Sequence, residues 1–296
     1  MKKLNNQGNV AILLCLVMTA LLGFTAYVTD VGLIYTEKTK LTNAIDSAAL
    51  AATLELPNDD SKAEKVAIDY LEKNDVNPNQ TTIAISADHK SIQITGVKNV
   101  KHSFAPIIGI NSSNVHAKTK AVIAPVKSTK GIRPFAVENY DFTYGDLVTL
   151  KRGAGDGYHG NYGAVALGGC GANVFRANAL YGYSGTISVG DYINTEPGNM
   201  AGACNDIKNY INSESSTFTN FPRDSIRLWT MPLVDSLVVN GRESVLVVGF
   251  AEFYVENVTK NSGKIEINGR FVKFVLNSDT DVNLPDTGAY GAKLSK

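Results

Sequence analysis

Two cysteines in the second half of the chain are the residues best able to form a covalent bond. Cys170 and Cys204 would lie outside the cell if the chain is anchored as argued below, and an oxidising exterior would allow them to pair. In the chain-entropy model a bridge closing a loop of this size contributes about 3–4 kcal/mol. The alternative is two unpaired buried thiols. Their spacing, with no histidine beside either, does not fit a metal site.

A glycine-rich stretch at residues 155–160, GDGYHG, matches the glycine pattern of dinucleotide-binding sites. That pattern works between a strand and a helix, because the phosphate then meets the helix N-terminus. The following residues, NYGAVALGGCGAN, contain too much glycine for such a helix. We therefore interpret the stretch as a surface loop and expect no cofactor.

Hydrolytic chemistry has equally thin support. Residues 182–186, GYSGT, miss the G-x-S-x-G elbow by one position, and the histidines have no metal-ligand spacing. Members of a Ser/His/Asp site meet only in space, so an envelope hydrolase using His159 stays open as an alternative. We expect that the protein is not an enzyme, and that residues 195–200, TEPGNM, form a structural turn. Residues 284–288, LPDTG, lack the apolar span and basic tail that follow a sortase signal, so we interpret them as a turn too.

The element that must position everything else is the uncharged apolar run from Val10 to Val28. It is long enough to cross a hydrocarbon core of roughly 30 Å as a helix, the only form that a single span can take. Lys2 and Lys3 precede it, and the next basic residue is Lys38. This charge bias predicts a cytoplasmic N-terminus and an extracellular C-terminal bulk in a single-pass cell-membrane protein. No A-x-A pattern closes the run, which favours an uncleaved anchor over a secretory signal peptide.

Helical spacing of apolar residues continues past the run, so we predict one helix from about residue 9 to 55. Residues 57–78 predict a second helix, with a capping box at Ser61 and Glu64. Alternation around residues 87–90 predicts a β-hairpin, and residues 113–126 predict a further strand broken at Pro125. Helix, helix, strand, strand, short helix and strand make a small α+β unit beside the anchor helix.

The polar residues 127–131 mark the expected domain boundary. Beyond them, short apolar segments alternate with Gly, Asn and Asp, which is typical of a β sandwich or barrel-like domain. The clearest hairpin turns at residues 261–263, and residues 205–213 predict a short helix. The fold class is therefore α+β. Its expected divisions are residues 1–9 as a cytoplasmic tail, 10–28 as the transmembrane helix, 29–126 as the helical extension and small α+β domain, and 131–296 as the β-rich extracellular domain.

Charge excludes one class of partner. Lys plus Arg and Asp plus Glu balance at 28 each, so there is no electrostatic case for binding nucleic acid. Membrane lipid is the partner that the apolar run predicts.

Residues 8–52 resemble a known family. Gly8 before the apolar run is followed by a string of acidic, glycine and small residues: Asp30, Gly32, Leu41, Asn43, Ala44, Asp46, Ala48, Ala49, Leu50, Ala51 and Ala52. Together they resemble the Tad (tight adherence) TadE/TadG-like family, bacterial proteins tied to the assembly of Flp-type pili. The resemblance covers about residues 7–55. More loosely, residues 131–135, 160–163, 195–200 and 290–294 resemble longer members found in Gram-positive bacteria.

The resemblance implies a cell-envelope protein with a structural role in pilus assembly or surface attachment, with other pilus-assembly or envelope proteins as partners. It implies no catalytic residue. Processed prepilins carry Glu five residues after the cleavage glycine, but Leu13 stands there, which argues against a polymerising pilin. The D-x-S-x-S metal site of some TadG proteins does not occur either. An extracellular ligand- or carbohydrate-binding module, using loops with Tyr158, Tyr162, Tyr181 and Tyr183, is the alternative from another class.

Overall fold

The computed structural model describes residues 7–139, 141–152, 161–196, 201–238, 241–261 and 264–295. The chain forms two compact units. The first unit comprises Met1–Ala52, Asp60–Ala121 and Leu294–Lys296, and the second comprises Thr53–Asp59 and Val122–Lys293. The change of unit at residue 121 falls inside a strand, not in the polar residues 127–131 that the sequence favours.

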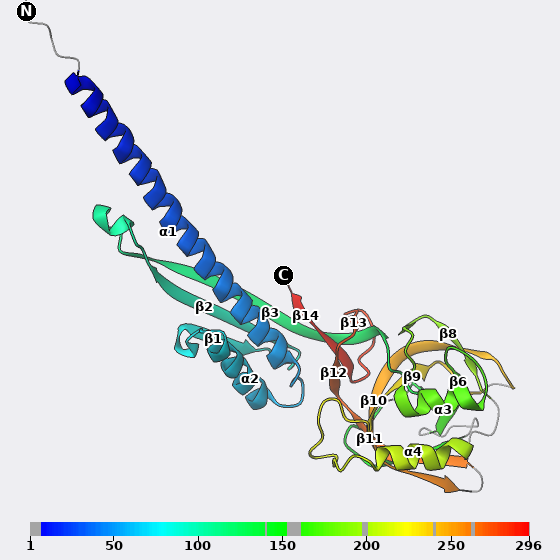
Figure 1. The fold of residues 1–296 in the computed structure, drawn as a ribbon. Helices are drawn as coiled ribbons and strands as arrows, with labels where there is room; N and C mark the ends of the chain where they lie inside the picture. The colour runs from blue at the N-terminus through cyan, green and yellow to red at the C-terminus, as the bar shows by residue number, and fades with distance from the viewer. Residues whose placement is uncertain are drawn as a thin grey trace, which may run out of the picture. The chain divides into compact units, whose positions relative to one another are not determined.

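A single helix, α1, runs from Gln7 to Thr53, which confirms the continuous helix predicted from residue 9 to 55 (Figure 1). Its first half is exposed, whereas one face of its second half is buried and consists mainly of small residues: Leu41, Ala44, Ile45, Ala48, Ala49 and Ala52. Small side chains let the helix approach a neighbouring sheet closely. A Cβ added to Gly96 of that sheet would lie only 3.0 Å from Leu41 Cδ1.

The first unit has the predicted order of elements. After α1 come α2 (Asp60–Lys73), η1 (Pro78–Gln80), β1 (Thr81–Ile85), β2 (Ser91–Lys101), η2 (Ala105–Ile108) and β3 (Ser112–Thr129). β1 and β2 form the predicted antiparallel hairpin, with Thr81 opposite Gly96 and Ile85 opposite Ile92. α2 begins at Asp60, so Ser61 lies within its first turn and is not its N-cap. The first sheet has the order β1-β2-β3-β14-β12, where β12 is Phe274–Leu276 and β14 is Ala289–Ser295.

The predicted break at Pro125 is wrong, because β3 continues through it to Thr129. Its partner there is the short strand β13 (Asp279–Thr280), whose register with β3 shifts between its two residues. Proline is tolerated at such irregularities because it has no N–H to contribute to the ladder. Its carbonyl is still used and accepts a bond from the Asp281 N–H at 3.1 Å.

The second unit contains a sheet that closes on itself. It is built from β4 (Phe135–Glu138), β5 (Val148–Arg152), β6 (Asn161–Ala166), β9 (Leu228–Val234), β10 (Ser244–Asn261) and β11 (Lys264–Val272). Its order is β11-β5-β6-β4-β9-β10, and β10 also pairs with β11, which closes the ring. β8 (Tyr192–Thr195) pairs with β10 and β6. Of the two predicted β architectures, this ring is the barrel-like one.

Two helices accompany the ring. α4 (Cys204–Ile211) matches the short helix expected at residues 205–213. The helix α3 (Ala172–Tyr181) was not expected, because Gly168, Gly169 and Gly171 come just before it and suggest a loop. These glycines have positive φ, and Gly171 is the N-cap, so the chain turns sharply into the helix. The remaining short elements are β7 (Ile187–Ser188) and η3 (Ala201–Ala203).

Aromatic packing around Phe135 joins α3 to the ring. Phe135 on β4 stacks on Trp229 of β9 with ring centroids 5.2 Å apart. It meets Tyr162 of β6 and Phe175 of α3 edge to face, at 5.2 and 5.4 Å. All four side chains are buried, and such pairs add stability beyond the area they bury.

We expect Phe135→Ala to lower the free energy of unfolding of the second unit by about 3–5 kcal/mol, the usual cost of such a cavity. Urea unfolding of the full-length protein in detergent, followed by the fluorescence of Trp229, measures this, since Trp229 is the only tryptophan. The exposed residue Leu147 supplies the control, because Leu147→Ala should change stability by no more than about 0.5 kcal/mol. Equal losses in the two variants would contradict the assigned core.

Candidate functional site

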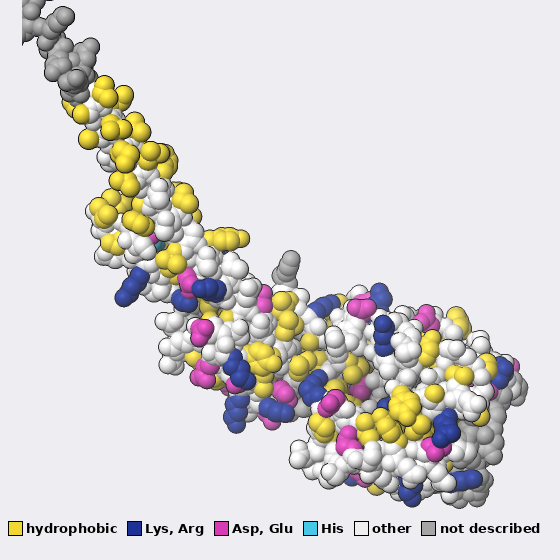
Figure 2. Space-filling model, in the orientation of Figure 1, with side chains coloured by type: hydrophobic (Ala, Val, Ile, Leu, Met, Phe, Trp, Pro, Cys, Tyr) yellow, Lys and Arg dark blue, Asp and Glu magenta, His cyan; other side chains and the backbone are white. Residues whose placement is uncertain are grey.

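The first half of α1 has the composition of a membrane span. It is uncharged from Val10 to Thr29, and its large apolar side chains point outward without protein neighbours. By length and composition this helix can cross a membrane, and it is the only such helix among the described residues. Figure 2 shows hydrophobic side chains along this half of the helix, while Lys and Arg side chains occur farther along the chain. These features support anchoring by a single N-terminal helix.

Asp30 holds a distant turn against α1 just beyond that apolar run. Its carboxylate accepts backbone hydrogen bonds from Ser103 and Ala105 at 2.7 Å each, and from Phe104 at 3.1 Å. Ala105 is the first residue of η2, and the N-cap of η2, Phe104, has no capping side chain of its own. The first N–H groups of a helix have no partner within it. Asp30 therefore supplies the missing cap from another element.

The charge of Asp30 suits this task. Burial by itself raises the pKa of the carboxyl group, but hydrogen bonds from Ser103, Ala105 and Phe104, with a smaller contribution from His102, lower it further than burial raises it. The pKa of Asp30 is therefore below its ordinary value of 3.8, and the carboxylate is ionised at neutral pH. A folded-state pKa that is depressed stabilises the docked turn above 3.8, and this stabilisation is lost as the pH falls through the folded value.

Further along α1, the other residues of the family-like string serve packing more than chemistry. The alanines of the buried face meet the sheet, as described above. Asp46 accepts a hydrogen bond from the Thr119 hydroxyl of β3. Glu37 forms ion pairs with Lys98 of β2 at 2.6 Å and with Lys40 at 2.9 Å. Gly32 has open space around its Cα. Asp30, Glu37 and Asp46 thus provide three polar contacts along one helix.

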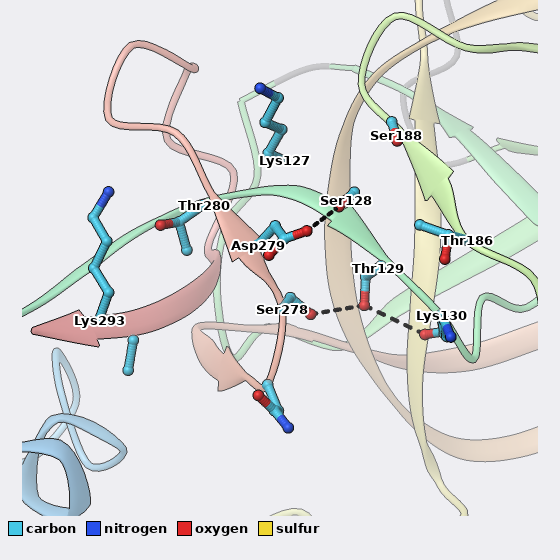
Figure 3. A pocket seen from close by; sticks show the side chains of 12 residues that line it. Lys127, Ser128, Thr129, Lys130, Thr186, Ser188, Ser278, Asp279, Thr280 and Lys293 are labelled. Carbon is cyan, nitrogen blue, oxygen red and sulfur yellow. Dashed lines mark hydrogen bonds between the residues drawn. The ribbon is translucent and has the colours of Figure 1, made fainter.

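The second unit has an open polar pocket of about 830 Å³ where β3, β7 and β13 meet (Figure 3). Lys127, Lys130 and Lys293 contribute ammonium groups. The carboxylate of Asp279 accepts a hydrogen bond from Ser128 at 3.0 Å, and the hydroxyls of Thr129 and Ser278 lie 2.7 Å apart. The lining residues include no histidine or cysteine. The pocket offers hydrogen bonds and positive charge.

A carboxyl group is buried in the second unit, away from solvent. Glu252 is 1% exposed, and its Oε1 has no hydrogen-bond partner among the described residues. Burial raises the pKa of Glu252 to about 8, and the Thr230 hydroxyl and the charge of Arg133 counter this only in part. Burial also lowers the pKa of Arg133, to about 10. A substrate cannot reach a group so enclosed, so we assign Glu252 to structure.

The cysteine pair is not joined in the structure. Cys170 is an exposed free thiol before α3, and Cys204 is a buried free thiol at the start of α4, where burial raises its pKa. The disulfide stays a prediction.

Several other sequence motifs either form part of the folded second unit or lie outside the described residues. Thr287 of LPDTG donates to the Phe250 carbonyl at 2.6 Å, which makes that segment part of the fold. Tyr162 is buried in the core and cannot serve a binding loop. The described ranges exclude residues 155–160, with Tyr158 and His159, and residues 197–200.

Residues 8–55 match the family model described as "Putative Flp pilus-assembly TadE/G-like". The match covers the membrane-type half of α1, Asp30 and the buried alanine face. No curated protein sequence and no solved structure matches the chain. The resemblance given by the residues of α1 is thereby confirmed for that segment.

We expect Asp30→Asn to loosen the turn. Asparagine keeps the shape but has one acceptor oxygen for three N–H groups, and its amide would face donors. Amide hydrogen exchange at residues 103–105, measured by mass spectrometry on the full-length protein in detergent, should accelerate by roughly tenfold.

The control is Asp69→Asn, which removes only the exposed ion pair with Lys73 within α2. It should leave exchange at the turn unchanged. Exchange in Asp30→Asn at the wild-type rate would show that the carboxylate does not hold the turn.

A second prediction concerns pH. Because the pKa of Glu252 is higher in the folded than in the unfolded protein, the second unit should lose stability as the pH rises from 4.5 towards 8. The loss should be on the order of a few kcal/mol. In Glu252→Gln this dependence should be much flatter, as measured by urea unfolding at pH 5 and pH 8. The exposed residue Glu243 gives the control, Glu243→Gln, which should behave like the wild type. An unchanged slope in Glu252→Gln would refute the assignment.

Proposed function

We propose that this protein is a single-pass, membrane-anchored envelope factor with a structural role in Flp-type pilus assembly or surface attachment. The observation that carries the proposal is the coincidence of the family match at residues 8–55 with the apolar helix and its docked turn. The matched segment is thus also the segment that joins the membrane to the folded part of the first unit.

The orientation we propose follows from charge. Lys2 and Lys3 precede the apolar run, and no other basic residue follows until Lys38. Positive residues are retained on the cytoplasmic side, so the N-terminus lies inside and the chain beyond the apolar run lies outside. The partners are then membrane lipid and other pilus-assembly or envelope proteins.

The mechanism we propose is scaffolding without catalysis. An α-helix is stiff, and α1 continues without interruption from the apolar run into the face packed on the sheet. Asp30 fixes the hairpin turn to that helix at one level. The sheet of the first unit is therefore held at a defined height above the membrane, where it can meet other assembly proteins.

We expect deletion of the gene in its source strain to abolish pili or surface attachment, and the wild-type protein and Asp69→Asn to restore them. Asp30→Asn should restore them poorly, because the turn at residues 103–105 is held less firmly to the helix. Electron microscopy of the cells and an adhesion assay measure both traits.

The location is checked in the same strains. After mild reduction, a membrane-impermeant maleimide should label Cys170 on intact cells, since its thiol is exposed. A deletion strain with normal pili and normal attachment would refute the proposed role, and labelling of Cys170 only after permeabilisation would refute the orientation.

A further inference from the structure

The turn between β2 and β3 exposes an unusual apolar cluster. Phe104, Ile107, Ile108 and Ile110 are 42%, 87%, 76% and 50% exposed, and residues 103–110, SFAPIIGI, contain no charge. Two neighbouring isoleucines so exposed are costly in water. A contiguous apolar patch of this kind marks a contact surface.

Most backbone N–H groups of this turn are satisfied from within the protein. Asp30 accepts from the N–H groups of residues 103–105. The N–H of Ile107 donates to the Phe104 carbonyl, that of Gly109 to Pro106, and that of Ile110 to Ala105, each at 3.1 Å. Pro106 has no N–H, and Gly109, with φ 86°, lets the chain turn back. Unsatisfied backbone groups exclude most loops from lipid, and this turn has few.

The position of the turn along α1 points to what covers it. Asp30 lies two residues beyond Val28, about 3 Å further along the helix axis. The turn docked on Asp30 therefore lies at the end of the membrane-type run. Figure 1 shows it beside α1, and Figure 2 shows its hydrophobic side chains continuous with those of the helix.

The helix beyond Asp30 supports the same level for the membrane surface. Residues 31–36, VGLIYT, are uncharged, and Val31 and Tyr35 are exposed. Tyrosine is enriched where lipid headgroups meet the hydrocarbon. Lys101, exposed at the end of β2, comes just before the turn. A lysine there can place its ammonium among phosphate headgroups while the isoleucines lie deeper.

We propose that residues 103–110 insert into the outer leaflet of the same membrane that α1 crosses, forming a second lipid contact beside the helix. This inference rests on the membrane anchoring proposed above. Phospholipid covers the apolar patch. The inserted turn then limits how far the sheet of the first unit can tilt relative to the membrane surface.

The test uses the full-length protein in phospholipid vesicles that contain doxyl-labelled lipids, which quench tryptophan fluorescence at a known depth. Ile107→Trp and, separately, Ile108→Trp place the reporter on the turn, and the signal of buried Trp229 in the wild type is subtracted. Two further variants serve as references, one expected inside the membrane and one expected outside it. Phe24→Trp lies in the apolar run, and Tyr70→Trp lies on α2, at the other end of the first unit (Figure 1).

We expect shallow doxyl groups to quench Ile107→Trp and Ile108→Trp several-fold more than Tyr70→Trp, and deep ones to quench Phe24→Trp most. If Phe24→Trp is quenched but both turn variants behave like Tyr70→Trp, the inference is overturned and the anchor stands. The other outcome is a turn tryptophan that shows blue-shifted emission but no quenching by doxyl lipids. If that blue shift grows with the number of protein molecules per vesicle, a second copy covers the patch, and the inference is again overturned. If Phe24→Trp escapes quenching as well, the anchor itself fails. Two reporters guard against one substitution disturbing the turn.

Discussion

The first unit depends on one carboxylate that meets three backbone N–H groups from a turn some seventy residues away. Alanine side chains pack closely but are small and alike, so they define poorly the register of a helix along a sheet. A shift of α1 by one helical turn, about 5.4 Å, would keep much of the alanine packing but would separate Asp30 from residues 103–105. The polar contact therefore sets the register that the small residues leave loose. Asp46 and Thr119 repeat this arrangement farther along the helix.

The second unit is stabilised by a different kind of contact. Large aromatic side chains around Phe135 fill the space between the ring of strands and α3, and their edge-to-face geometry defines one arrangement. The second unit also buries the carboxyl group of Glu252. The free-energy cost of burying this group is reduced because it stays protonated near neutral pH. The first unit thus uses the ionised carboxylate of Asp30 to hold a turn, whereas the second unit keeps the buried carboxyl group of Glu252 protonated.

Sequence patterns predicted the elements that depend on interactions between residues close together in the chain. Uninterrupted helix formers predicted α1, alternation predicted the hairpin of β1 and β2, and the turn at residues 261–263 predicted the pairing of β10 with β11. Closure of the ring depends on pairings between distant strands, and no local pattern reveals them. The break expected at Pro125 was wrong because β3 continues through it, beside a register shift in the pairing with β13. Of the candidate site, the sequence predicted the apolar run and, by resemblance, included Asp30 in the family-like string. The hydrogen-bond partners of Asp30 could not be predicted from the sequence, because almost every residue has a backbone N–H group and residue type does not reveal which ones are used.

The ring of β11-β5-β6-β4-β9-β10 bears on how any partner can recognise the second unit. Each of these strands has a neighbour on both sides, and β8 is itself paired with two of them. Subunits that polymerise by lending a strand to an open sheet edge need unpaired backbone groups along that edge. Within the described residues, this ring has no such edge. A neighbour that meets this ring must therefore recognise its side chains and loops, because the ring, in the part that the structure describes, has no free backbone ladder to share.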